Sequence, residues 1–198
     1  MTKGKLLKAA LRIFTRDGFE AARIEDIAAE AGYTRGAFYA HFQTKEDLFF
    51  AMLEAESERH MERVKANMEV CKNDQERINV LREYYATRLA DRQWAILVTE
   101  FKLFALRRSR MRAKLAEMHR SIRTKIKLKG LERLWPQAVR CTDHEFLLRR
   151  VALEIMKNGL ALEHAYDPAA VSETQAKFLL RQLFDFLVEA PSTHTHGL

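Results

Sequence analysis

Apolar residues recur every three or four positions along most of the chain, and this spacing places them on one face of an α-helix. Glycine, proline and short polar runs separate the periodic stretches, and several of these runs contain residues that favour helix starts. The pattern predicts an all-α protein of about nine helices. The predicted helices cover approximately residues 3–16, 24–31, 34–42, 44–68, 73–91, 94–104, 110–135, 142–166 and 172–190.

The segment from Ile24 to Phe42 has the pattern of two short helices joined by a tight turn. Gly32 follows the first helix at a position where the chain needs a positive φ, and Thr34 can cap the second helix with its hydroxyl. Phe38 and Phe42, four residues apart, point into a small core. This arrangement predicts a helix-turn-helix whose second helix enters the major groove of DNA. Its outward-facing residues are Arg35, Gly36, Tyr39 and His41.

The stretch from Ala28 to Leu48, AAEAGYTRGAFYAHFQTKEDL, resembles the signature of TetR-type transcriptional regulators (TetR/AcrR type). The resemblance implies a three-helix DNA-binding head followed by a helical domain for ligand binding and dimerisation. We therefore expect a DNA-binding domain over residues 1–46, an effector-binding and dimerisation domain over residues 47–190, and a disordered tail over residues 191–198.

The outward residues of the second helix have side chains that suit contacts with DNA. Arginine can make two hydrogen bonds to a guanine edge or bind phosphate, glycine lets a helix approach base edges closely, and tyrosine can donate to phosphate. The resemblance implies that the positions matching this motif face DNA. Arg23 replaces a hydroxyl residue frequent in the family and can reach phosphate instead. The predicted DNA-binding residues are Thr34, Arg35, Gly36, Tyr39, His41, Lys45 and Arg23.

Two of these residues have purely structural alternatives. Thr34 can act as a helix cap alone, and His41 can be a packed or N–H-bonded histidine.

The larger helical domain is predicted to enclose a pocket for a small-molecule effector, as the resemblance implies. An apolar and partly aromatic effector fits the residues of the middle helices, because small-molecule pockets have mostly apolar walls with a few polar groups. Glu100, His119 and Glu154 interrupt apolar faces and can orient a ligand or face solvent. The candidate wall residues, for which plain core packing is the alternative, are Trp94, Leu97, Phe101, Phe104, Met118, Ile122, Trp135 and Met156.

The last two predicted helices are apolar on more than one side, and a helix with two apolar faces needs two partners. Gly159 also permits close approach of another helix. The resemblance implies a homodimer through these two helices, whereas the alternative is that both faces are used within one subunit. A dimer would bind two half-sites about one helical turn (~34–36 Å) or a multiple apart, hence a palindromic operator.

The net charge of +7 suits a nucleic-acid partner, but most of the excess lies outside the predicted head. Residues 107–133 include 11 basic and 2 acidic residues, for a net charge of +9. An apolar stripe runs through this segment, and the basic side chains mainly occupy its other faces. They form a simple solvated face; the alternatives are that they attract DNA at long range or favour anionic ligands. The helix-turn-helix pattern, rather than the overall charge, is therefore the basis for predicting DNA binding.

Several classes of function are disfavoured by the sequence. No run of about 18 apolar residues predicts a membrane span, and no signal-peptide core is present, so a cytoplasmic protein is expected. Cys71 and Cys141 have no metal or redox spacing, and neither a metal nor another cofactor is predicted. The chain contains no phosphate-binding glycine loop, nucleophile elbow or HExxH motif, so it is not expected to be an enzyme.

These patterns predict a sequence-specific transcriptional regulator that binds double-stranded DNA. The family resemblance favours a repressor that a small-molecule effector releases from its operator. The alternative is an effector-independent, DNA-binding architectural protein with the same head and a solid helical domain. A helical interaction module that has lost DNA binding is a further alternative.

Overall fold

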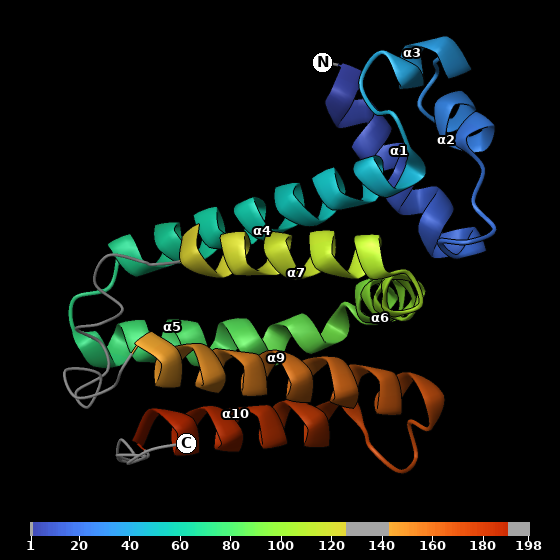
Figure 1. Cartoon of the computed structure of the whole chain (residues 1–198). Coiled ribbons are helices and arrows are strands. Elements are labelled where there is room, and N and C mark those ends of the chain that lie inside the picture. The colour runs from blue at the N-terminus through green and yellow to red at the C-terminus, as the bar shows by residue number, and fades with distance from the viewer. Residues whose placement is uncertain (1, 126–142, 190–198) are drawn as a thin grey trace. The chain divides into compact units, whose positions relative to one another are not determined.

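The computed structural model describes residues 2–125 and 143–189 of the chain. Within these ranges it contains nine α-helices and no strand, which confirms the predicted all-α fold (Figure 1). The predicted tail over residues 191–198, Trp135 and Cys141 lie outside the described residues. The helices are α1 (Thr2–Asp17), α2 (Ile24–Glu30), α3 (Arg35–Tyr39), α4 (Lys45–Glu69), α5 (Asp74–Thr87), α6 (Arg92–Leu106), α7 (Ser109–Lys125), α9 (Asp143–Tyr166) and α10 (Glu173–Glu189).

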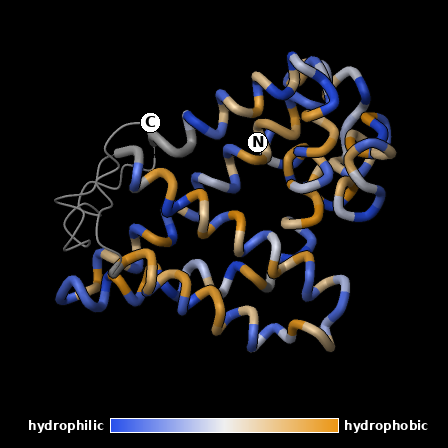
Figure 2. The backbone as a smooth tube through the Cα atoms, turned by 60° about the horizontal axis from the view of Figure 1, so that its bottom comes forward, coloured by the Kyte–Doolittle hydropathy of each residue, from blue (hydrophilic) through white to orange (hydrophobic). Residues whose placement is uncertain are grey.

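The local sequence determines where several helices begin. The Thr44 hydroxyl accepts a hydrogen bond from the Asp47 N–H at 3.0 Å, which starts α4. Before α10, Ser172 and Gln175 form a reciprocal capping box, in which each side chain accepts from the other residue's backbone N–H. Along the helices, hydrophobic and hydrophilic residues alternate over short distances (Figure 2). The predicted helix starts at these positions are confirmed.

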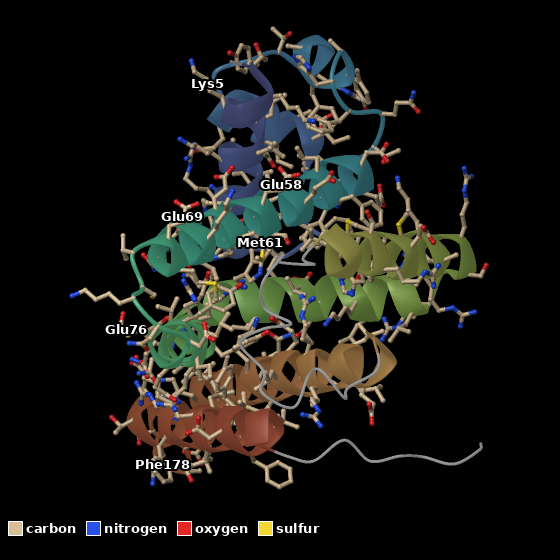
Figure 3. The ribbon with its side chains drawn as sticks, turned by 90° about the vertical axis from the view of Figure 1, so that its left-hand side faces the viewer. Lys5, Glu58, Met61, Glu69, Glu76 and Phe178 are labelled. Atoms are coloured by element: carbon tan, nitrogen blue, oxygen red, sulfur yellow. The ribbon has the colours of Figure 1, made fainter. Side chains whose placement is uncertain are left out.

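The chain forms two compact units. Unit 1 comprises Met1–Met61 and Gln93–Thr124, and unit 2 comprises Glu62–Arg92 and Lys125–Leu198. Helix α4 is continuous across this division, and Met61, labelled in Figure 3, is its last residue in unit 1. The division falls within α4, and the predicted boundary between a DNA-binding and an effector-binding domain after residue 46 stays a prediction.

Unit 1 has a core of stacked and edge-on aromatic rings that joins the N-terminal helices to α6. The centroid of the Phe19 ring lies 5.3 Å from the ring centroid of Phe49, 4.7 Å from that of Phe101 and 4.8 Å from that of Phe104. Phe49 and Phe101 stack at 3.9 Å between centroids. Burial of a phenyl side chain contributes roughly 1.5–3 kcal/mol, so these rings hold α6 and the N-terminal helices in one unit.

Unit 2 is built on α5, α9 and α10, which lie side by side (Figure 1). Ion pairs connect α5 to α10: Arg181 makes two bonds to Glu83, at 2.7 and 2.8 Å, and Arg82 pairs with Asp185 at 2.7 Å. Apolar residues from α4, α5, α9 and α10 fill its core: Val64, Leu81, Tyr85, Leu153, Phe184 and Val188.

Candidate nucleic-acid interface

The turn between α2 and α3 is a Schellman motif. Gly32 has a φ of +75°, a conformation that glycine adopts without steric cost. Its N–H donates to the Ala29 carbonyl at 2.9 Å, and the Tyr33 N–H donates to the Ala28 carbonyl at 2.8 Å. The predicted role of Gly32 at the end of α2 is confirmed, and the turn sets the direction in which α3 leaves.

Helix α3 begins at a cap and buries one side. The Thr34 hydroxyl accepts from the Ala37 N–H at 3.3 Å. Phe38 is fully buried and Phe42 is 6% exposed, and their ring centroids lie 5.9 Å apart in the core of unit 1. Because Phe38 anchors the inner side of the helix and Phe42 anchors the chain just beyond it, the side chains of Arg35 and Tyr39 are left on the outer side, where both are exposed.

Arg35 is held by two neighbours on this exposed side. Its Nη1 lies 2.9 Å from Glu25 Oε1 in the first turn of α2, and its Nη2 donates to the Tyr39 hydroxyl at 3.3 Å. The hydrogen bond to Tyr39, with the Glu25 charge as a smaller cause, raises the pKa of Arg35 above its ordinary value. The guanidinium is therefore a permanent positive charge with defined contacts. Spacing along the chain does not indicate a role for Glu25, because its contact with Arg35 depends on the angle between α2 and α3.

Gly36 lies in open space. A Cβ built at this position would meet only the Thr34 hydroxyl oxygen, at 3.7 Å, which is an ordinary van der Waals distance. Its φ lies outside the left-handed region, unlike those of Gly18 and Gly32. Packing and backbone conformation within the chain therefore do not require glycine at position 36.

His41 follows α3 by two residues, and Arg23 directly precedes α2. Both side chains are exposed, so the packed alternative for His41 does not apply. Arg23 is the N-terminal cap residue of α2, and its side chain makes no capping hydrogen bond. Both residues present polar groups to solvent.

Lys45 has a more structural position than the sequence suggested. Its Nζ donates to the Glu20 carbonyl at 2.8 Å and to the Ala22 carbonyl at 2.9 Å, and it lies 4.8 Å from the Phe19 ring centroid. Burial lowers the pKa of Lys45, although neighbouring carboxylates act in the opposite direction. An ammonium group has three hydrogens, so these two bonds leave a phosphate contact chemically possible.

The loop of residues 18–22, whose carbonyls accept from Lys45, also binds Glu100 of α6 through its backbone N–H groups. Glu100 Oε1 accepts from the Phe19 N–H at 2.7 Å and from the Glu20 N–H at 3.4 Å. Gly18 has a φ of +79°, and a Cβ there would lie 2.9 Å from Glu100 Oε1. Glu100, expected to orient a ligand or face solvent, instead satisfies backbone donors in the core of unit 1.

The predicted effector-pocket residues fall in different places. Leu97 and Phe101 are buried in the core of unit 1, and Trp94, Phe104 and Met118 are partly buried against the same cluster. Met156 belongs to unit 2 and is 40% exposed. The Ile122 side chain and Trp135 lie outside the described residues. Of the polar candidates, His119 is half-buried in α7, and Glu154 pairs with Lys157 at 2.5 Å.

No group of three or more potential metal ligands occurs among the described residues. Over the same part of the chain, every helix is too short or too polar to cross a membrane.

The N-terminal region matches a known family. Residues 6–52 match the model of bacterial regulatory proteins of the tetR family. The HTH-type transcriptional regulator AcrR of Shigella flexneri is 46% identical over 48 residues, which are 24% of this chain and 22% of that protein. The matches to this and other curated relatives, including QacR, cover less than half of the relatives' lengths.

Solved structures share the fold over nearly the whole chain. The fatty acid degradation regulator FadR of Bacillus halodurans has a TM-score of 0.71 and 16% identity, and the comparison covers 99% of this chain and 97% of FadR. FadR of Bacillus subtilis, solved with stearoyl-CoA, has a TM-score of 0.64 and 18% identity over 94% of this chain and 97% of its own. At these identities the likeness concerns the fold alone.

Proposed function

Because the chain belongs to the TetR family of bacterial regulatory proteins, we propose that it is a sequence-specific, DNA-binding transcriptional repressor. Proteins of this family are regulators and not enzymes. The observation that carries the proposal is the exposed side of α3, which presents Arg35, Gly36 and Tyr39 together. In this proposal the protein acts in the cytoplasm, where its DNA partner is.

Each exposed residue of α3 has a role at the major groove in this proposal. Arg35 makes paired hydrogen bonds to a guanine, and Tyr39 contacts phosphate or a thymine methyl. Gly36 lets the helix backbone approach the base edges. This close approach explains the glycine, which packing within the chain does not require. Other polar groups near α3 position the protein on phosphates: Thr34, His41, Arg23 and the remaining hydrogen of Lys45.

The proposed homodimer forms through the outer faces of α9 and α10. On α9, exposed apolar residues recur at the spacing of a helix stripe: Leu148 is 53% exposed, Ile155 67% and Tyr166 88%. Phe178, labelled on α10 in Figure 3, is 57% exposed, and Phe186 is 67% exposed. Exposed apolar side chains gathered on two adjacent helices are typical of an interface between subunits.

Gly159 lies on the α9 stripe between Ile155 and Tyr166. It is exposed, and a Cβ there would meet nothing within 4 Å in the subunit. In the proposed dimer it permits close approach of a partner helix. Two heads held this way would bind a palindromic operator with half-sites about one helical turn (~34–36 Å) or a multiple apart.

Release from DNA by an apolar small-molecule effector completes the proposed function. FadR of Bacillus subtilis, which shares this fold, was solved with stearoyl-CoA. The protein has one arrangement that binds DNA and one that does not. An effector releases the protein from DNA if its own affinity is higher for the second arrangement.

Selection of bound sites from random duplex DNA, at about physiological salt, tests DNA recognition. Enrichment of a palindrome is expected. Arg35→Ala should lower affinity for the enriched site by about 1–3 kcal/mol and relax specificity at one base pair. Arg12→Ala is the matched control, since Arg12 is also an exposed arginine paired with a glutamate, Glu30, in unit 1. Failure to enrich any sequence would instead favour an architectural DNA-binding protein.

Sedimentation measures the proposed dimer. Ile155→Glu places a charge at the centre of the α9 stripe and should shift the protein from dimer to monomer, because a buried unpaired charge is costly. Val70→Glu is the control: Val70 is 79% exposed and lies in the connection between α4 and α5, so it belongs to neither stripe. If both variants sediment like the parent, the dimer face is elsewhere.

A further inference from the structure

An acidic residue of α2 contacts the exposed side of α3, and its position needs explanation. Glu25 is exposed, with a side chain 46% accessible, and its Oε1 lies 2.9 Å from Arg35 Nη1. DNA is uniformly negative along its backbone, so a carboxylate at this surface opposes association. Its presence is therefore unfavourable for non-specific affinity.

Stability of the fold is a weak explanation for the pair. The Arg35 side chain is 62% accessible, and ion pairs between such exposed groups contribute little to stability. Glu25 also lies in the first turn of α2, where an acidic residue interacts favourably with the helix dipole. Asp26 occupies the same turn, however, so the dipole alone does not explain why Glu25 contacts Arg35.

The geometry defines the direction of the guanidinium. One terminal nitrogen of Arg35 is held by Glu25 and the other donates to the Tyr39 hydroxyl at 3.3 Å. The guanidinium is planar, so two contacts on different nitrogens restrict its rotation as well as its position. A side chain ordered before binding loses less conformational entropy when it meets its partner.

We propose that Glu25 is a positioning residue for base recognition, which orients Arg35 toward one base edge and thereby raises sequence discrimination at the expense of non-specific affinity. This inference rests on the proposed function, because it requires Arg35 to read a base. Glu25 acts through Arg35 and makes no contact with the base itself. A charge that lowers affinity for every site but increases the difference in affinity between the correct site and other sites is a recognised route to specificity.

The test measures discrimination, defined as the ratio of affinities for the selected operator and for the same operator substituted at the base pair that Arg35 reads. That base pair is the one at which Arg35→Ala loses its preference. Glu25→Gln should bind both duplexes at least as tightly as the parent, while discrimination falls at least fivefold. Asp26→Asn is the matched control, because it removes the same charge from the same turn; its discrimination should stay within twofold of the parent's.

A double variant separates positioning from a general charge effect. In an Arg35→Ala background, Glu25→Gln should change discrimination at that base pair by less than twofold. The inference is overturned if Glu25→Gln alone retains the parent's discrimination, or if Asp26→Asn loses as much. A parent protein that discriminates among no sequences would overturn the proposed function and this inference with it, so the two failures are distinguishable.

Discussion

The contact between Glu100 and the 18–22 loop allows a quantitative prediction about how unit 1 is held together. Phe19 is fully buried, and its N–H donates to Glu100 Oε1 at 2.7 Å. Glu100→Ala removes this acceptor, so the N–H of the buried Phe19 loses its hydrogen-bond partner. A buried donor that loses an ionised acceptor costs about 1–3 kcal/mol, and we take about 2 kcal/mol for this one.

Amide hydrogen exchange is the appropriate assay, because a protein with two compact units need not unfold in one step. A loss of about 2 kcal/mol corresponds to roughly 30-fold faster exchange of the Phe19 amide. Glu100→Gln retains an acceptor oxygen but not the charge, so its acceleration should be smaller, roughly tenfold or less.

Glu117→Ala is the control for this experiment. Glu117 is an exposed glutamate of the same unit, and it pairs with Arg120 on the surface of α7. Its removal should leave the exchange of the Phe19 amide unchanged. If Glu100→Ala also left that rate within threefold of the parent's, the claim that Glu100 stabilises the loop would be wrong.

Two further perturbations test α4 and α3. Burial raises the pKa of Glu56, but hydrogen bonds from His60 and Arg59 outweigh it and hold the pKa at about 2, below the ordinary 4.5. The ionised form stabilises the fold above pH 4.5, and this contribution is lost as the pH falls toward 2. Hydrogen exchange of the α4 amides should show that Glu56→Gln abolishes about 2 kcal/mol of the stability loss between pH 5 and pH 3. Glu58→Gln, at an exposed site of α4, should leave that loss unchanged. Gly36→Ala should raise helix stability by about 0.5–1 kcal/mol yet weaken operator binding roughly tenfold in a titration, whereas Gly4→Ala, at another open helical position, should keep full affinity. Unchanged affinity in Gly36→Ala would contradict close approach of α3 to DNA.

The sequence by itself was sufficient for features that depend on residues close together in the chain. Gly32, Thr34 and Phe38 predicted the turn, the cap and the buried side of α3, because a Schellman turn and an N-terminal cap involve backbone groups only a few residues apart. The capping box of Ser172 and Gln175 likewise joins groups only three residues apart, at the predicted start of the last helix. Helical periodicity likewise predicted the all-α fold.

Only the tertiary structure decided which distant residues meet. Glu100 and Phe19 are 81 positions apart, and no local pattern indicates that the carboxylate accepts the Phe19 N–H. Leu97 and Phe101 have the same apolar character whether they line a pocket or fill a core, and their burial in unit 1 depends on how α6 packs. Local hydrogen bonds and helical periodicity depend on the spacing of residues along the chain. Contacts between distant residues depend instead on how the helices pack, and that spacing does not determine the packing.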